Sequence, residues 1–120
     1  MTIERRHVGK RMSAVAINRV SATAYLAGQV ATDPTANITG QTQQVLAQID
    51  SLLSEAGSDK AKILSATIYL NDMNDFAAMN AVWDSWVVPG QTPARATVQA
   101  KLASPEYRIE IQVVALAAAA

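Results

Sequence analysis

Arg95 and Glu110 have the side chains best suited to chemistry on a small anionic molecule in this 120-residue chain. A guanidinium group binds a carboxylate through two parallel hydrogen bonds, and a carboxylate can serve as a general base. The chain has no cysteine and a single histidine, His7, which disfavours thiol catalysis, a serine–histidine–aspartate triad and a zinc site. We therefore expect arginine, carboxylate, hydroxyl and backbone groups to carry any chemistry, and we expect no metal.

The segment around Arg95 alternates in polarity with a period of two, which is typical of a strand with two different faces. The apolar set is Ala94, Ala96, Val98, Ala100 and Leu102, and the polar set is Arg95, Thr97, Gln99 and Lys101. We expect the apolar set to pack under helices and the polar set to lie on the opposite face. The segment 107–116 alternates in the same way. If the two strands are neighbours, Arg95, Thr97 and Glu110 share the helix-free face.

Simpler interpretations exist for each of these residues. Arg95 and Glu110 could form an ordinary cross-strand ion pair, worth less than about 1 kcal/mol if exposed, and spacing alone favours this. Thr97 suits any strand, Asn80 could be a satisfied boundary residue, and Gly28 could serve a bulge or a close backbone approach. Against this, isolated buried charges are costly, so charges on an otherwise apolar sheet face indicate a covering subunit or a ligand. His7 is interpreted as a surface residue, and Trp83 and Trp86 as core.

The elements that must position these residues follow from hydrophobic periodicity. The predicted strands are 3–8, 11–20, 23–29, 63–70, 94–102 and 107–116, and the predicted helices are 41–56 and the segment from the N-cap Asp72 to Pro89. Gly57 is expected to end the first helix, and the strand 63–70 to be buried on both faces. The order β-β-β-α-β-α-β-β predicts one α+β domain over residues 1–120, with a mixed sheet, both helices on one face, and a frayed tail at 117–120.

Charge and composition exclude several classes of function. Ten Lys and Arg balance ten Asp and Glu, whereas nucleic-acid binders need a basic excess, and the basic cluster at 5–11 is interpreted as a solvated strand. No apolar run approaches the ~20 residues that span a bilayer, and no signal peptide is recognisable. A cytoplasmic protein without membrane or nucleic-acid partners is expected. Only 17% of residues are charged, against about 25% on average, which favours surface hidden in an oligomer.

Three segments resemble one known family. The run from Pro93 to Val98, followed by Ile109-Glu110-Ile111, resembles the C-terminal signature of the RidA (YjgF/YER057c) reactive-intermediate deaminases. The strand end Tyr25–Val30 is similar to that family's Ser-Gly-Gln segment, and Asn71–Asn80 is similar to its Asp-Leu-Asn-Asp-Phe helix start. The matching segments keep their order and spacing over residues 12–117.

This resemblance implies a chorismate-mutase-like fold and a homotrimer whose sheets line a central barrel, with clefts between subunits. It also implies cofactor-independent hydrolysis of enamines and imines, of the 2-aminoacrylate and 2-iminopropionate class, to 2-oxo acids and ammonia. Arg95 would clamp the substrate carboxylate, and Glu110 would activate water. Thr97 and Gly28 would hold the substrate through their backbone, with Asn80 at the rim.

The chain departs from the family pattern at three positions. Ser13-Ala14 stands where the family has a tyrosine, Ala27 replaces a serine, and Thr97 replaces a frequent cysteine. The first two changes open space, so a hydrolase for a bulkier imine or a carbamate-like substrate is an alternative. A non-catalytic trimer that binds small carboxylates, as a sensor or chaperone, is another. Nucleic-acid cleavage, proposed for relatives, fits the neutral charge poorly.

Overall fold

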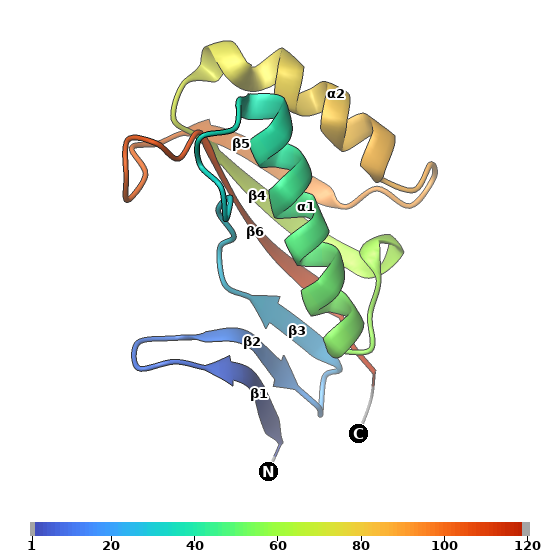
Figure 1. Ribbon diagram of the computed structural model, residues 1–120. Helices are drawn as coiled ribbons and strands as arrows, with labels where there is room; N and C mark the ends of the chain where they lie inside the picture. The colour runs from blue at the N-terminus through green and yellow to red at the C-terminus, as the bar shows by residue number, and fades with distance from the viewer. Residues whose placement is uncertain (1, 119–120) are drawn as a thin grey trace.

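Segments with period-two alternation form one six-stranded mixed sheet in the computed structural model, which describes residues 2–118 (Figure 1). The strands are β1 (Ile3–Val8), β2 (Ser13–Asn18), β3 (Thr23–Leu26), β4 (Ile63–Leu70), β5 (Ala94–Gln99) and β6 (Ile109–Leu116). Their spatial order is β1-β2-β3-β6-β4-β5, and only β4 and β5 pair in parallel. The predicted order of elements is confirmed, although four of the strands are shorter than expected. β5, which carries Arg95, lies at one edge of the sheet.

Two helices cover one face of this sheet, as predicted (Figure 1). Helix α1 (Ile38–Glu55) begins three residues before the expected start, because the side chain of Asn37 accepts a hydrogen bond from the Gly40 amide at 2.9 Å. Gly57 follows the helix with φ of +72°, the left-handed conformation expected there. Helix α2 (Phe76–Trp86) is preceded by the 3₁₀ turn η2 (Met73–Asp75), which Asp72 caps. A second 3₁₀ turn, η1 (Lys60–Lys62), precedes β4.

The hydrophobic core lies between the helices and the sheet. An apolar stripe that runs along α1 to its C-cap residue is buried: Val45, Leu46, Ile49, Leu52, Leu53 and Ala56. The expectation that β4 is buried on both faces is wrong for the single chain. Ala66, Ile68 and Leu70 are buried beneath the helices, whereas Ser65 is exposed and Tyr69 half-buried on the other side. The helix-free face of the sheet is thus uncovered, although β4 is an inner strand.

The ends of the described chain are held by hydrogen bonds. Ala117 and Ala118, which were expected to fray, donate to the carbonyls of Ala22 at 2.7 Å and Ala56 at 3.2 Å. Residues 119–120 of the expected frayed tail lie outside the described residues. Exposed basic side chains do occupy the β1–β2 hairpin, as predicted, and Arg6 pairs with Glu4 at 3.3 Å. None of the helices between residues 2 and 118 is long and apolar enough to cross a membrane.

Candidate functional site

Arg95 and Thr97 lie on the helix-covered face of β5, contrary to the expectation that they share the helix-free face with Glu110. In the parallel register, Arg95 stands beside Ala66 and Thr97 beside Ile68, and both partners are buried under the helices. Alternation shows which residues share a side but not which side faces the core. For the edge strand β5, the register with β4 decides the question.

The small apolar set of β5 consequently lies on the uncovered face. Ala94, Ala96 and Val98 are all exposed, with 44% of Val98 accessible. Tyr25 and Leu116, from β3 and β6, add exposed apolar area at 51% and 44% accessibility. The uncovered face is therefore more apolar than the sequence pattern predicted.

Arg95 packs against two aromatic rings of α2. Its guanidinium carbon lies 5.3 Å from the ring centroid of Trp83 and 5.9 Å from that of Phe76, within cation–π range. Asn80 lies on the same stripe of the helix, because residues three and four apart are neighbours on a helix surface. We call Arg95, Thr97, Asn80, Phe76 and Trp83 the Arg95 cluster. Trp83 was predicted only as a core residue, and the role of Phe76 and Trp83 as ring platforms follows from the side on which Arg95 lies.

Two polar atoms of the Arg95 cluster are buried without a hydrogen-bond partner in the described chain. They are the Oδ1 of Asn80 and the Oγ1 of Thr97. A buried polar atom left without a partner costs about 1–3 kcal/mol, so such atoms are usually satisfied in the working state of a protein. The cluster therefore has unused hydrogen-bonding capacity beside an arginine: the Thr97 hydroxyl can donate to an anionic group, and the Asn80 oxygen can accept from an N–H group.

Glu110 lies on the opposite, uncovered face of the sheet, directly beside Tyr69 in the antiparallel register of β4 and β6. It lines a pocket of about 320 Å³, which we call the Glu110 pocket. The lining residues are Tyr69, Ala100, Lys101, Leu102, Ala103, Glu110 and Gln112. Sequence reasoning did not assign Tyr69, Lys101 or Gln112 to the site, because their closeness depends on strand register and on the path of the loop after β5.

Gly28 lies against the Glu110 side chain, as a close backbone approach would require. A Cβ atom at Gly28 would stand 2.9 Å from the carboxyl carbon of Glu110 and would overlap its carboxylate oxygen. The position of the Gly28 backbone beside β6 is fixed by the next residue, because Gln29 and Ile111 exchange backbone hydrogen bonds of 2.8 and 3.1 Å. The structure thus brings Gly28 and Glu110 together, and any larger residue at position 28 would displace the carboxylate.

The predicted site residues therefore form two groups on opposite faces of one sheet. Arg95, Thr97 and Asn80 belong to the Arg95 cluster, and Glu110 and Gly28 to the Glu110 pocket. No ion pair joins Arg95 to Glu110 in the described chain. A cross-strand ion pair between them is excluded, because the sheet separates the two side chains.

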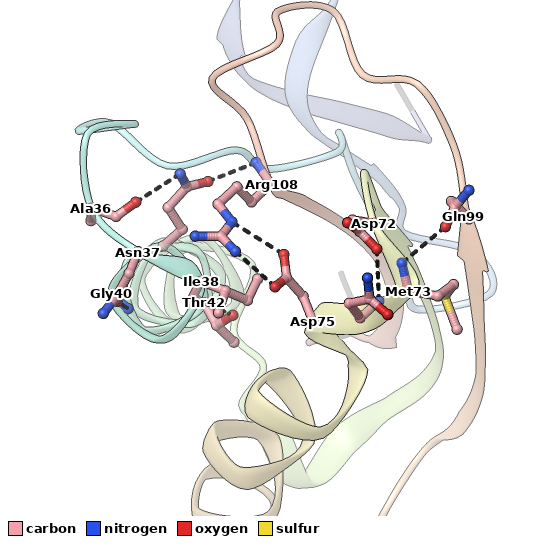
Figure 2. A network of polar contacts seen from close by, with 12 residues as sticks. Ala36, Asn37, Ile38, Gly40, Thr42, Asp72, Met73, Asp75, Gln99 and Arg108 are labelled. Carbon is pink, nitrogen blue, oxygen red and sulfur yellow. Dashed lines mark hydrogen bonds and ion pairs between the residues drawn. The ribbon is translucent and has the colours of Figure 1, made fainter.

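A polar network fixes Arg108, the residue that immediately precedes β6 and lies two residues before Glu110 (Figure 2). Arg108 donates to both carboxylate oxygens of the buried Asp75, at 3.1 and 2.8 Å. Gln41, which has no exposed surface, accepts from the Arg108 amide at 2.9 Å. Its side-chain amide also donates to three carbonyls, those of Pro34, Ala36 and Glu106. Helix α1, the loop before it and the loop before β6 are joined at this one side chain.

Replacing Gln41 by leucine is expected to lower the free energy of unfolding by about 2–4 kcal/mol, because buried amide and carbonyl groups lose their partners. Urea unfolding followed by circular dichroism measures the change. Gln43→Leu, on the exposed side of the same helix, is the matched control and should change stability by less than about 0.5 kcal/mol. Equal losses in the two variants would contradict this role for Gln41.

The remaining candidate groups form no further catalytic cluster. His7 is exposed, as expected, and its Nε2 lies 2.8 Å from a carboxylate oxygen of Glu55. Trp86, predicted as a core residue, is half-buried against the core and donates to Asp50 at 3.0 Å. Across residues 2–118, no three His, Cys, Asp or Glu side chains gather closely enough to hold a metal ion.

Comparison with known proteins shows extensive similarity. The family model described as endoribonuclease L-PSP matches residues 7–117. The RutC family protein YoaB of Escherichia coli is 50% identical over 115 residues, covering 96% of this chain and 98% of that protein. A RutC family protein of Haemophilus ducreyi is 46% identical over 113 residues, covering 94% of this chain and 95% of that protein.

Solved structures agree with these sequence matches. A YjgF-family protein of Neisseria meningitidis superposes with a TM-score of 0.94 at 46% identity, covering 100% of this chain and 98% of that one. A protein of the conserved Rid family from Yersinia pestis gives a TM-score of 0.83 at 28% identity, covering 91% and 90% of the two chains.

Proposed function

The chain belongs to the YjgF/RidA family described as endoribonuclease L-PSP, and from this premise we propose that it is a cytoplasmic, cofactor-independent deaminase of reactive enamines and imines. Its substrates are small 2-imino acids and their enamine tautomers, and its products are 2-oxo acids and ammonia. The observation that carries the proposal is the Arg95 cluster, where an arginine stacked on two rings lies beside two buried, unpartnered polar atoms.

The Arg95 cluster is suited to holding the substrate carboxylate. The rings of Phe76 and Trp83 restrict the guanidinium, which reduces the entropy lost when it binds a carboxylate through two hydrogen bonds. The side chains of Asn80 and Thr97 and the backbone beside them supply further hydrogen bonds to the substrate. With the carboxylate held, the imine carbon is presented for attack.

Glu110 supplies the general base in this mechanism. Its carboxylate takes a proton from a water molecule as the water oxygen bonds to the imine carbon, and it returns that proton to the nitrogen. The resulting carbinolamine then loses its hydroxyl proton to Glu110, which passes it to the nitrogen, so that ammonia leaves as the carbonyl group forms. The net reaction consumes one imine and one water and yields one 2-oxo acid and one ammonia. No electron transfer occurs, so no redox cofactor is needed, and Gly28 leaves space for the carboxylate to sit against the backbone.

The complete site forms between chains in this proposal. The Arg95 cluster and Glu110 occupy opposite faces of one sheet, so a single chain cannot apply both to one small substrate. The exposed apolar side chains of the uncovered face, among them Tyr25, Val98 and Leu116, favour burial against other copies. A homotrimer with its sheets facing inward would place the Arg95 cluster of one chain beside Glu110 of the next.

The proposal predicts that the protein accelerates hydrolysis of 2-iminopropionate released from alanine by an amino acid oxidase, measured by competition with semicarbazide. Arg95→Ala should reduce kcat/KM by roughly 100-fold or more, since two charge-assisted hydrogen bonds are lost. Arg95→Lys keeps the positive charge but cannot bind a carboxylate through two parallel hydrogen bonds. Its kcat/KM should therefore lie between those of the wild type and Arg95→Ala.

Two other outcomes would reject this activity. If the wild-type protein binds pyruvate but does not accelerate hydrolysis, the protein is a carboxylate-binding module and not a deaminase. If Arg95→Ala hydrolyses the imine as fast as the wild type, Arg95 does not hold the substrate.

A further inference from the structure

The residues that line the Glu110 pocket include a lysine that the proposed reaction does not use. Lys101 lines this pocket together with Glu110 and Tyr69. It is exposed and forms no ion pair with any residue between positions 2 and 118. General-base chemistry at Glu110 requires no neighbouring ammonium group, and Arg95 already accounts for the substrate carboxylate. The lysine is therefore available for a second anionic group.

The loop that carries Lys101 is held in place by backbone contacts at both ends. The amide of Ala100 donates to the carbonyl of Leu70 at 2.9 Å, which continues the β4–β5 pairing past the end of β5. At the other end, Gln41 donates to the carbonyl of Glu106 at 3.1 Å and accepts from the amide of Arg108 at 2.9 Å. The backbone of Lys101 is thus fixed relative to the strand that presents Glu110.

The lining of the pocket also includes a neutral hydrogen-bond donor, the hydroxyl of Tyr69. Tyr69 is the direct register partner of Glu110, so the two side chains project from adjacent strands on the same face. The pocket, at about 320 Å³, lies within the range of small-molecule sites, about 300–1,000 Å³. An ammonium, a phenol and a catalytic carboxylate thus line one site of suitable size.

We propose that the Glu110 pocket selects 2-imino acids that carry a second carboxylate, and that Lys101 determines this specificity by binding the distal group. The inference rests on the proposed deaminase function and adds its substrate class. The α-carboxylate is held by the Arg95 cluster, water attacks the imine carbon beside Glu110, and the distal carboxylate pairs with Lys101 while Tyr69 donates a hydrogen bond to it. A monocarboxylic imine leaves Lys101 hydrated and gains nothing from it.

The test compares imines generated by amino acid oxidases from alanine and from glutamate. The wild type should favour the glutamate-derived imine, and Lys101→Met should lower kcat/KM for that substrate by about tenfold. The same variant should change the value for the alanine-derived imine by less than about twofold. Lys101→Arg should preserve the preference. Lys62→Met is the matched control, because Lys62 precedes β4 whereas Tyr69 lies near its far end.

The outcomes separate this inference from the proposed function. If Lys101→Met affects both imines equally, or neither, Lys101 does not determine specificity, although the deaminase function stands. If the wild type hydrolyses neither imine, the deaminase function fails, and calorimetric binding of 2-oxoglutarate and pyruvate then decides the specificity of the pocket. A preference for 2-oxoglutarate that is lost in Lys101→Met supports the assignment, and the absence of such a preference overturns it.

Discussion

Glu110→Gln is expected to lower kcat for imine hydrolysis by roughly 10²–10⁴-fold, the usual contribution of a general base. Glutamine has nearly the same shape as glutamate, so it retains the packing against Gly28, but its amide cannot take a proton from water. Because Arg95 is unchanged, the affinity for pyruvate should stay within about threefold of the wild-type value. Single-turnover rates with 2-iminopropionate and calorimetric titration with pyruvate measure the two quantities separately.

The matched control for this substitution is Glu106→Gln, an exposed glutamate in the loop before β6. This substitution removes one negative charge from the same part of the chain. It should leave kcat within about twofold of the wild-type value, as expected of an exposed charge outside the catalytic site. A Glu110→Gln variant that retains full kcat would show that water is activated by another group. Loss of pyruvate binding together with kcat would instead indicate that Glu110 holds the ligand.

Much of the fold was predictable because its determinants are local. The first helix and its end at Gly57 depend on neighbours within a few residues, and both predictions are confirmed. The early start of α1 was missed, since a three-residue shift depends on the hydrogen bond from Gly40 to the Asn37 side chain. Burial of β4 on both faces was overestimated. The sequence of an apolar strand has the same pattern whether its second face packs against its own chain or against another chain.

The site was predictable in its residue types but not in its geometry. The pattern singled out Arg95 and Glu110, and family membership is shown by the comparisons. The placement of Arg95 was wrong because β5 pairs only with β4, and its small apolar residues are suited to either face. A guanidinium normally avoids a helix-covered face, but here the rings of Phe76 and Trp83 provide a surface on which it can stack. Lys101 and Tyr69 were missed because they join Glu110 only through register and loop path.

Arg95 and Glu110 lie on opposite faces of the sheet, and this arrangement leads to the prediction with the largest change in activity. Arg95→Ala and Glu110→Gln should each be almost inactive when pure, because in the proposed assembly every intersubunit site lacks one group. When the two variants are unfolded together in equal amounts and refolded, about one quarter of the wild-type activity should return. In a cyclic assembly, one interface in four combines the intact Arg95 of one chain with the intact Glu110 of the next.

The control is refolding of each variant alone followed by mixing without denaturant, which should restore no activity while subunits do not exchange. Recovery of about one quarter of the wild-type activity also distinguishes a site shared between two chains from the alternative arrangements. If one chain supplied both groups to each site, every site in a mixed assembly would carry one of the two substitutions, and co-refolding would leave the activity near that of the pure variants. A monomeric enzyme would give the same result. Recovered activity therefore requires that Arg95 and Glu110 act from different chains, as proposed from their positions on opposite faces of the sheet.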